Sequence, residues 1–268
     1  MLIDTHCHLD AAEFDADRAA ALQAARAGGV AGFLVPAVGA SNFEAVAALS
    51  ASHPDVVHAF GIHPMYVGQA QEGDLDLLQA RLAGGGAVAV GEIGLDGFVQ
   101  DGCMPLQLHY FEAQLRLAKA FELPVVLHVR RAQDEILKLL RRIRPPGGIA
   151  HAFNGSLQQA EAFIKLGFRL GFGGAMTYTG SRRIRQLAAE LPISAIVLET
   201  DAPDIPPAWG AGQRNDPANL PRFAEVLAQL RGMPVDEVVE ATGANALAAI
   251  PGLRQLAGLR PASPPESR

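Results

Sequence analysis

Short apolar runs alternate with amphipathic stretches along most of this 268-residue chain. Eight of the runs have the length and composition of buried strands, and each is followed by a stretch with helical periodicity. The apolar runs cover residues 2–8, 32–36, 56–62, 87–92, 124–128, 148–151, 169–172 and 195–201. The helical stretches cover residues 16–28, 41–52, 74–82, 105–121, 134–144, 157–166, 182–190, 217–230 and 235–250. This alternation predicts an α/β fold in which helical crossovers join parallel strands.

Polar side chains stand at or near the ends of six of these strands, and their distribution separates two α/β architectures. An open doubly wound sheet gathers such groups mainly at one switch point. A closed barrel carries its active site on a ring at the C-terminal ends of its strands. The sequence therefore predicts a single (β/α)₈ TIM barrel over residues 1–258, followed by a disordered polar tail at residues 259–268.

The composition predicts a soluble protein of the cytoplasm. Hydrophobic residues make up 49% of the chain, and no apolar run approaches the roughly 20 residues of a membrane span. The N-terminus lacks the layout of a signal peptide, and two cysteines make no disulfide framework. A formal net charge of −6 argues against broad, non-specific nucleic-acid binding. It is compatible with a local patch of basic residues at the mouth of the barrel. We expect neither a membrane nor an obligate protein partner.

The first apolar run carries a His-x-His pair. In an extended strand Asp4, His6 and His8 share one face, so both imidazoles can reach the same metal ion. Cys7 points to the opposite face, where it is expected to pack as a small apolar residue. Alone, the pair is a weak signal that equally fits two buried, hydrogen-bonded histidines.

Further ionisable residues at strand ends strengthen the metal-site interpretation. The full set of candidate ligands is His6, His8, Glu92, His128, His151 and Asp201. These are too many for one tetrahedral zinc and suit two ions that share a bridging carboxylate. We expect Glu92 to bridge, with His6, His8 and Asp201 on one ion and His128 and His151 on the other. Two divalent ions per subunit are therefore predicted, and the donor set allows zinc, manganese, magnesium or cobalt.

Six motifs occur in order along the chain. They are Asp-Thr-His-Cys-His-Leu-Asp (4–10), Gly-Ile-His-Pro (61–64), Gly-Glu-Ile-Gly-Leu-Asp (91–96), Leu-His-Val-Arg (127–130), His-Ala-Phe-Asn-Gly-Ser (151–156) and Leu-Glu-Thr-Asp-Ala-Pro (198–203). Together they resemble the TatD family of metal-dependent hydrolases. Residues 173–178 and Asp204 are similar to its YjjV-like branch. Two loop positions depart from many relatives, with Met65 in place of a histidine and Gly97-Phe98 in place of two aromatics.

The resemblance implies an amidohydrolase-like barrel and a divalent-metal deoxyribonuclease that acts on DNA from the 3′ end. Its metal ligands fall on the six residues grouped above. In such a site a metal-activated water attacks phosphorus, and we expect Asp201, as a ligand able to take the proton, to be the general base. The expected substrate is a DNA end or another phosphate ester.

Several other residues are assigned supporting roles. His63 is expected to contact phosphate or the leaving group, or to be structural, and Arg130 to bind phosphate or orient a ligating carboxylate. Glu199 and Asp4 are expected to lie behind the ligands, with Glu199 bonded to a ligand histidine. From barrel geometry we expect two groups of arginines: Arg182, Arg183, Arg185 and Arg214 at the mouth, and Arg141, Arg142 and Arg144 on the far face. Arg182 and Arg183 are expected to bind substrate phosphates, with solvated charges that have no partner as the alternative.

Two alternatives remain open at the level of sequence. The same metal site could serve an amidohydrolase-like enzyme that cleaves a small-molecule ester or amide. The barrel could instead be a non-catalytic binding protein, although a complete ligand set argues against that.

Overall fold

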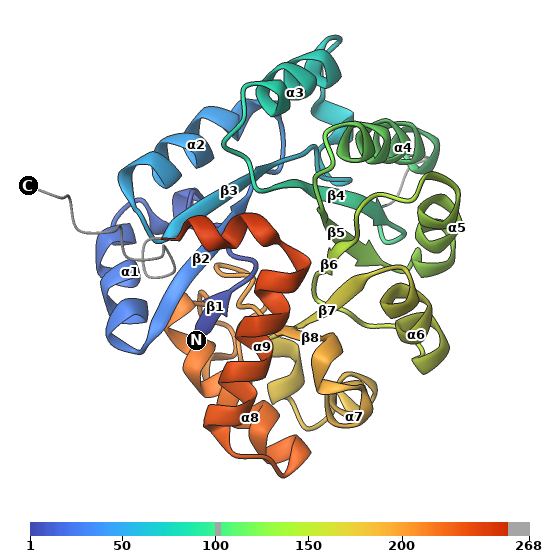
Figure 1. Ribbon diagram of the computed structural model, residues 1–268. Helices are drawn as coiled ribbons and strands as arrows, with labels where there is room; N and C mark the ends of the chain where they lie inside the picture. Colours follow the sequence, from blue (N-terminus) through green and yellow to red (C-terminus); the bar gives the residue numbers. More distant parts are fainter. Residues whose placement is uncertain (100–102, 257–268) are drawn as a thin grey trace, which may run out of the picture.

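The computed structural model describes residues 1–99 and 103–256 and shows a nearly closed barrel of parallel strands with helices around it (Figure 1). The sheet runs in chain order from β1 to β8. The strands are β1 (Leu2–Asp4), β2 (Val30–Pro36), β3 (Val56–Phe60), β4 (Ala89–Asp96), β5 (Val125–Arg130), β6 (Gly148–Ala150), β7 (Phe168–Phe172) and β8 (Ile196–Leu198). The predicted (β/α)₈ TIM barrel is thereby confirmed.

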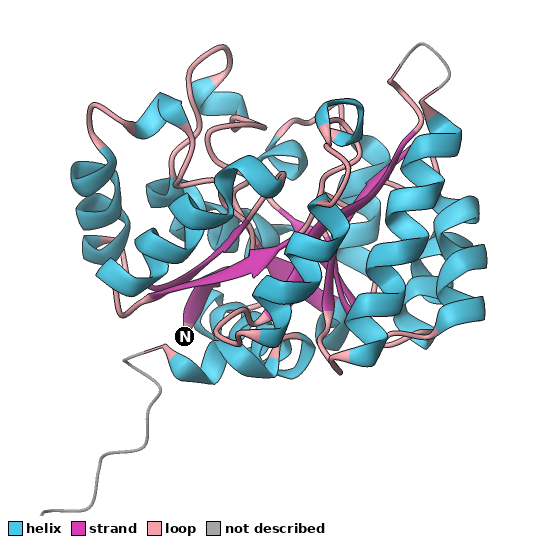
Figure 2. Cartoon of the chain, turned by 90° about the horizontal axis from the view of Figure 1, so that it is seen from above, coloured by secondary structure: helices cyan, strands magenta, loops and turns pink. Residues whose placement is uncertain are grey.

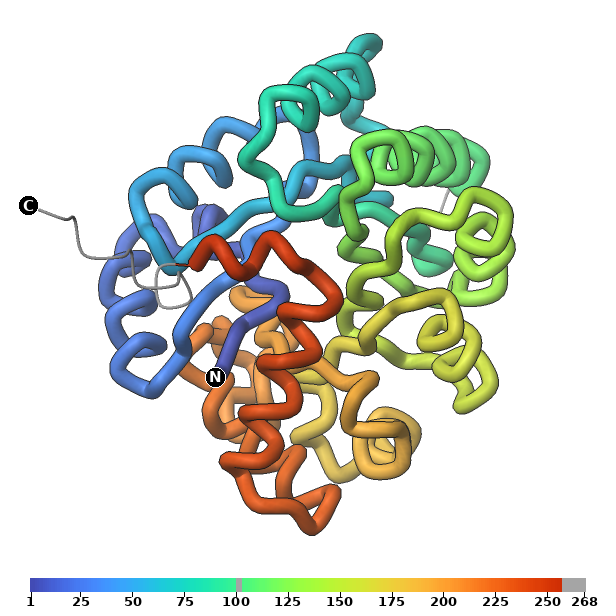
Figure 3. Tube along the Cα trace, in the orientation of Figure 1, coloured from blue at the N-terminus to red at the C-terminus, as the bar shows by residue number. Residues whose placement is uncertain are grey.

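The helices form the outer layer of the barrel, as the view in Figure 2 shows. They are α1 (Arg18–Ala27), α2 (Phe43–Ser52), α3 (Asp74–Ala83), α4 (Met104–Ala120), α5 (Gln133–Ile143), α6 (Leu157–Lys165), α7 (Arg182–Glu190), α8 (Leu220–Arg231) and α9 (Val235–Ala249). Along the trace in Figure 3, each strand is followed by its helix around the barrel. Within the described ranges, no helix is long and apolar enough to cross a membrane. The predicted tail at residues 259–268 lies outside these ranges.

Backbone hydrogen bonds join the first strand to the last. The Thr5 N–H and its hydroxyl both donate to the Leu198 carbonyl, at 3.2 and 3.1 Å. One step further on, the Asp201 N–H donates to the His6 carbonyl at 2.8 Å. The N-terminal motif therefore lies directly beside the segment around residue 200, on the side of the barrel where the strands end.

The other end of the barrel is covered by α9, which crosses it in Figure 1. The apolar interior includes Ile3, Leu34, Val57, Val126, Ile149, Val197, Ala246, Ala249, Ile250, Leu253 and Leu256. Gly32 illustrates how closely these parts pack, because a Cβ there would lie 2.3 Å from a methyl of Leu256. A larger cluster fills the space between the strands and the surrounding helices.

Two strand boundaries differ from the prediction. β1 ends at Asp4 rather than continuing to residue 8, although the chain after it stays bonded to its neighbours, with the Cys7 N–H donating to the Leu34 carbonyl. β4 runs on to Asp96, and its pairing with β5 shifts register between Val90 and Ile93. Glu92 therefore stands at an irregularity inside a strand and not at a strand end.

His58, a buried histidine on β3, is not a predicted metal ligand, and its burial gives a prediction for the pH dependence of stability. His58 is 8% exposed, and burial lowers its pKa to about 4. The unfolded chain therefore takes up a proton near pH 6.5, whereas the folded chain does so only near pH 4. The stabilising contribution is complete above pH 6.5 and is lost as the pH falls. Between pH 7.5 and 5 we expect a loss of about 2 kcal/mol.

Denaturant unfolding of wild type and His58→Leu at both pH values, with chelator present, measures this loss. The variant should lose about 2 kcal/mol less than wild type on acidification. His109→Leu, at an exposed histidine of α4, serves as the matched control. An equal pH dependence in wild type and His58→Leu would contradict the assignment.

Candidate metal centre

Four donor atoms from three parts of the chain converge at the ends of the strands. His6 Nε2 lies 3.1 Å from Glu92 Oε2, 3.1 Å from His8 Nε2 and 3.5 Å from Asp201 Oδ1. His8 Nε2 lies 3.6 Å from the same Glu92 oxygen and 3.7 Å from the same Asp201 oxygen. In a tetrahedral site with bonds of about 2.1 Å, ligand atoms stand about 3.4 Å apart. His6, His8 and Asp201 therefore form one group with the spacing and chemistry to hold a divalent ion, and Glu92 Oε2 lies beside both histidines of that group.

The second oxygen of Glu92 faces a different pair of imidazoles. Oε1 lies 3.0 Å from His128 Nδ1 and 3.3 Å from His63 Nε2, and these two nitrogens are 3.0 Å apart. Glu92 is 1% exposed, so both of its oxygens are committed to these neighbours. One carboxylate thus presents one oxygen to each of two donor groups, which is the arrangement that a bridging ligand requires.

The hydrogen bonding of His63 indicates a donor rather than a ligand. The Met65 N–H donates to His63 Nδ1 at 3.1 Å, so the proton of the neutral ring is on Nε2. Burial lowers the pKa of His63 and favours this neutral form. His63 therefore directs an N–H toward Glu92 and His128, and this assignment of the tautomer follows from the Met65 contact.

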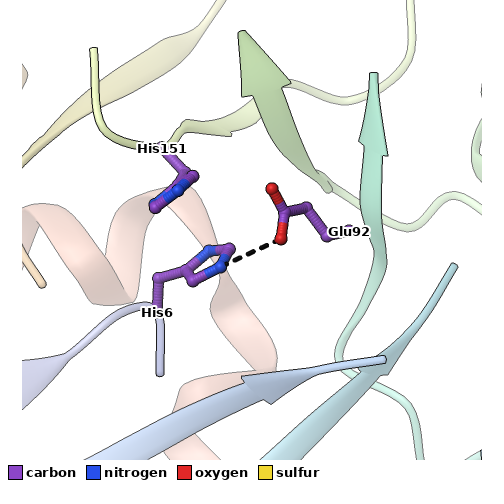
Figure 4. A group of neighbouring side chains, drawn as sticks. All are labelled: His6, Glu92 and His151. Carbon is purple, nitrogen blue, oxygen red and sulfur yellow. Dashed lines mark ion pairs between the residues drawn. The ribbon is translucent and has the colours of Figure 1, made fainter. Parts of the chain in front are cut away.

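His151 lies against the first group of donors (Figure 4). Its ring stacks on that of His6 with centroids 3.7 Å apart, and its Nε2 is 3.6 Å from Asp201 Oδ1. The rings of His151 and His128 are 6.5 Å apart. All six predicted ligands thus surround one small space. In addition, His63 lies beside His128, and the ring of His151 lies beside that of His6.

Glu199 supports His151 from behind. Its Oε1 lies 3.0 Å from His151 Nδ1 and accepts the Ala152 N–H at 2.6 Å. Asp4 holds the backbone instead of a ligand side chain, because its carboxylate accepts the N–H and the hydroxyl of Thr200 at 2.9 and 2.6 Å. Burial raises the pKa of Asp4 to about 7.

Asp96 is a site residue that the sequence reasoning did not single out. Its Oδ2 lies 2.9 Å from His128 Nε2, and its Oδ1 accepts the Phe98 N–H at 2.7 Å. Burial raises the pKa of Asp96, but these two hydrogen bonds outweigh burial and lower the pKa below its usual value. The charged carboxylate therefore fixes the proton of His128 on Nε2 and turns Nδ1 toward Glu92. The sequence signal was the aspartate that ends the Gly-Leu-Asp run.

The buried carboxylates and imidazoles of this centre adjust one another's protonation. Burial opposes the charged form of His8 and of His151, but nearby carboxylates raise their pKa values to about 9 and about 10. Burial raises the pKa of Asp201 to about 6, while His151 and His8 lower it. Two carboxylates this deeply buried require positive charge beside them, which protonated imidazoles or divalent cations supply.

A cleft opens above the metal centre, and its lining shows where the predicted arginines lie. Arg183 lines the cleft together with Arg130 and its neighbour Arg131, whereas the exposed Arg182 is outside the described lining. Arg185 and Arg214, also expected at the mouth, are outside the described lining of the cleft and have partners of their own. Arg185 donates to the Met176 carbonyl, and Arg214 is paired with Asp17 and Asp216. The far-face arginines Arg141, Arg142 and Arg144 are exposed at the end of α5.

A glycine on β7 makes room for Glu199. A Cβ at Gly171 would lie 2.1 Å from Glu199 Oε2, so Gly171→Ala must displace that carboxylate from His151. Loss of such a supporting group weakens metal binding about 10- to 100-fold. We expect a loss of this size in metal titrations, whereas Gly180→Ala, with open space around its Cβ, should bind metal like wild type. Wild-type affinity in Gly171→Ala would contradict the role given to Glu199.

Comparison with known proteins places the chain in a family. The model of the TatD related DNase family matches residues 3–250. The metal-dependent hydrolase YjjV of Escherichia coli (strain K12) is 43% identical over 242 residues, covering 89% of this chain and 93% of that protein. The human deoxyribonuclease TATDN3 is 31% identical over 268 residues, covering 95% and 96% of the two chains.

Solved structures agree with these matches. The crystal structure of YjjV from Escherichia coli K12 aligns with a TM-score of 0.90 and 41% identity, covering 93% of this chain and 98% of that one. A TatD family hydrolase from Entamoeba histolytica shares the fold, with a TM-score of 0.81, 20% identity, and coverage of 93% of this chain and 97% of that one. The chain therefore belongs to the TatD family of metal-dependent hydrolases.

Proposed function

We propose that this hydrolase is a two-metal phosphodiesterase that removes nucleotides from the 3′ end of DNA. The observation that carries the proposal is the position of Glu92, which offers one oxygen to His6 and His8 and the other to His128. The name of the human relative, a deoxyribonuclease, supports DNA as the substrate.

The donors would divide between two ions that share Glu92. His6, His8 and Asp201 would hold the first ion, and His128 with His151 would hold the second. His63 lies as close to Glu92, at 3.3 Å, but its Nε2 carries a proton and suits a contact with substrate oxygen. When bound, the ions would supply Lewis acidity and an activated water.

Asp201 would accept the proton of the attacking water. Its Oδ1 stands among the donors of the first ion, and its side chain is 12% exposed on the floor of the cleft. The backbone of Asp201 has a φ of 60°, in the left-handed region, which is uncommon outside glycine. This conformation is held by the Asp201 N–H, which donates to the His6 carbonyl.

Charges of both signs line the cleft. Arg130, Arg131 and Arg183 line it together with the carboxylates of Asp10, Glu13 and Asp204. Phosphates are attracted to the arginines and repelled by the carboxylates, so we expect a polynucleotide to bind along the arginines.

The experiment that tests the proposal uses protein loaded in turn with zinc, manganese, magnesium or cobalt. Single-stranded DNA labelled at its 5′ end should shorten stepwise, and DNA labelled at its 3′ end should release labelled mononucleotide at once. RNA, a simple phosphodiester and a small amide are tested in parallel, and chelator should stop all turnover. Turnover of the ester or amide with neither nucleic acid would overturn the proposal in favour of a small-molecule hydrolase.

A further inference from the structure

An exposed aromatic ring at the rim of the cleft holds two guanidinium groups. Phe98 is 48% exposed, and its ring centroid lies 4.4 Å from Arg130 Cζ and 4.1 Å from Arg131 Cζ. All three side chains line the cleft. A guanidinium held over a ring gains cation–π attraction and has less rotamer freedom to lose when it binds an anion.

The backbone around this cluster is arranged so that the three side chains meet. The Gly97 N–H donates to the Arg130 carbonyl at 2.7 Å, and a Cβ at Gly97 would lie 2.6 Å from the Arg131 carbonyl oxygen. Arg131 itself has a φ of 52°, in the left-handed region that non-glycine residues rarely occupy. Backbone strain of this kind persists where the surrounding structure holds it, and it is common at binding sites.

The charges of the cluster are mostly uncompensated. Over residues 1–99 and 103–256, no carboxylate is paired with Arg131. Arg130 has one weak partner, Asp96 Oδ2 at 3.7 Å, and that oxygen is already shared with His128 Nε2 at 2.9 Å. The rim of the cleft therefore presents two fixed positive charges on a chain whose formal net charge is −6.

We propose that Phe98, Arg130 and Arg131 form a clamp for the substrate phosphate next to the one that is cleaved. This proposal rests on the proposed phosphodiesterase function. The scissile phosphate would lie over the metal centre, and the clamp is separated from that centre by the carboxylate of Asp96 and the ring of His128. Arg130 is thus set back from the metal centre by these two groups, and Arg131 contacts the same Phe98 ring as Arg130. Asp96, which accepts both His128 Nε2–H and the Phe98 N–H, keeps the clamp in register with the metal ligands.

The test is a thermodynamic cycle. It removes either the positive charge of the arginine or the negative charge of the neighbouring phosphate, and then both. The substrates are short single-stranded oligonucleotides in which the linkage next to the scissile one is either a normal phosphate or a neutral methylphosphonate. The proteins are wild type, Arg131→Gln, Phe98→Leu and the far-face control Arg141→Gln. For the normal linkage we expect KM to rise about tenfold in Arg131→Gln, with kcat within about twofold of wild type. Phe98→Leu should raise KM to a smaller extent, because the arginines remain but are no longer held.

The neutral linkage separates the clamp from other effects. It should raise the KM of wild type about tenfold and add almost nothing in Arg131→Gln, because the charge that it removes has already lost its partner. Arg141→Gln should match wild type on both substrates. Equal effects of the neutral linkage in wild type and Arg131→Gln would overturn the clamp, even if DNA is cleaved normally.

Equilibrium binding without turnover keeps the two proposals distinguishable. In the presence of chelator, the salt dependence of oligonucleotide binding should weaken by about 0.7 in slope for Arg131→Gln and not for Arg141→Gln. If these slopes are found, but the metal-loaded enzyme cleaves no phosphodiester, the clamp is supported and the proposed reaction is contradicted. Identical slopes for the two variants would sink the clamp, whatever the activity.

Discussion

Glu92→Ala is expected to abolish hydrolysis and to lower the bound metal from two ions per chain toward one. The two oxygens of this carboxylate face separate donor groups, so its removal takes one ligand from each ion. It also removes negative charge that balances the cations in a buried site, where an uncompensated charge is strongly unfavourable. Metal analysis of the purified variant, together with its rate on labelled DNA, measures both effects.

Two controls make the Glu92 result interpretable. Glu44→Ala changes an exposed glutamate of α2 and should keep full metal content and activity. Glu92→Gln keeps the side-chain volume, so a folded Glu92→Gln protein with reduced metal separates loss of charge from loss of packing. Two tightly bound ions in Glu92→Ala would show that this carboxylate is not the bridge.

Asp201→Asn is expected to lose about 10²- to 10⁴-fold in kcat while keeping its fold and its metal. An amide oxygen can still coordinate an ion, but the amide cannot accept the proton of the attacking water. Metal content and rate are therefore measured on the same sample, because a loss of ions would assign the defect to coordination. A variant within a few-fold of wild type would remove Asp201 from the role of general base.

Much of the architecture could be predicted because its signals are local. Apolar runs of strand length and the helical stretches between them are read within a window of a few residues, and the barrel followed from polar groups at several strand ends. The grouping of Glu92 with His6 and His8 also followed, since strand ends of a barrel meet on one face. The irregularity of β4 at Glu92 could not be predicted, because it depends on the register with β5.

The parts that escaped prediction depend on contacts between distant segments. Asp96 was not singled out, because its contact with His128 joins residues 32 positions apart in the sequence. The tautomer of His63 is a separate case, because it depends on a local contact with the Met65 N–H that only the folded backbone conformation sets. The ion pair of Arg214 with Asp17 joins two residues that are far apart in the sequence. No pattern in the sequence reports which charged partner a flexible arginine will find.

The bond between the two ends of the barrel has a consequence during protein synthesis. A hydrogen bond joins Thr5 to Leu198, which is 193 residues further along the chain. His6, next to Thr5, lies beside Asp201 where the first and last strands adjoin. A ribosome adds roughly 5–20 residues each second, so Asp201 is synthesised many seconds after His6 and His8. Until then β1 can pair with β2 on one edge only, and a fragment that ends before residue 200 lacks the Asp201 of the first donor group. Metal capture at that group can only follow translation of most of the chain.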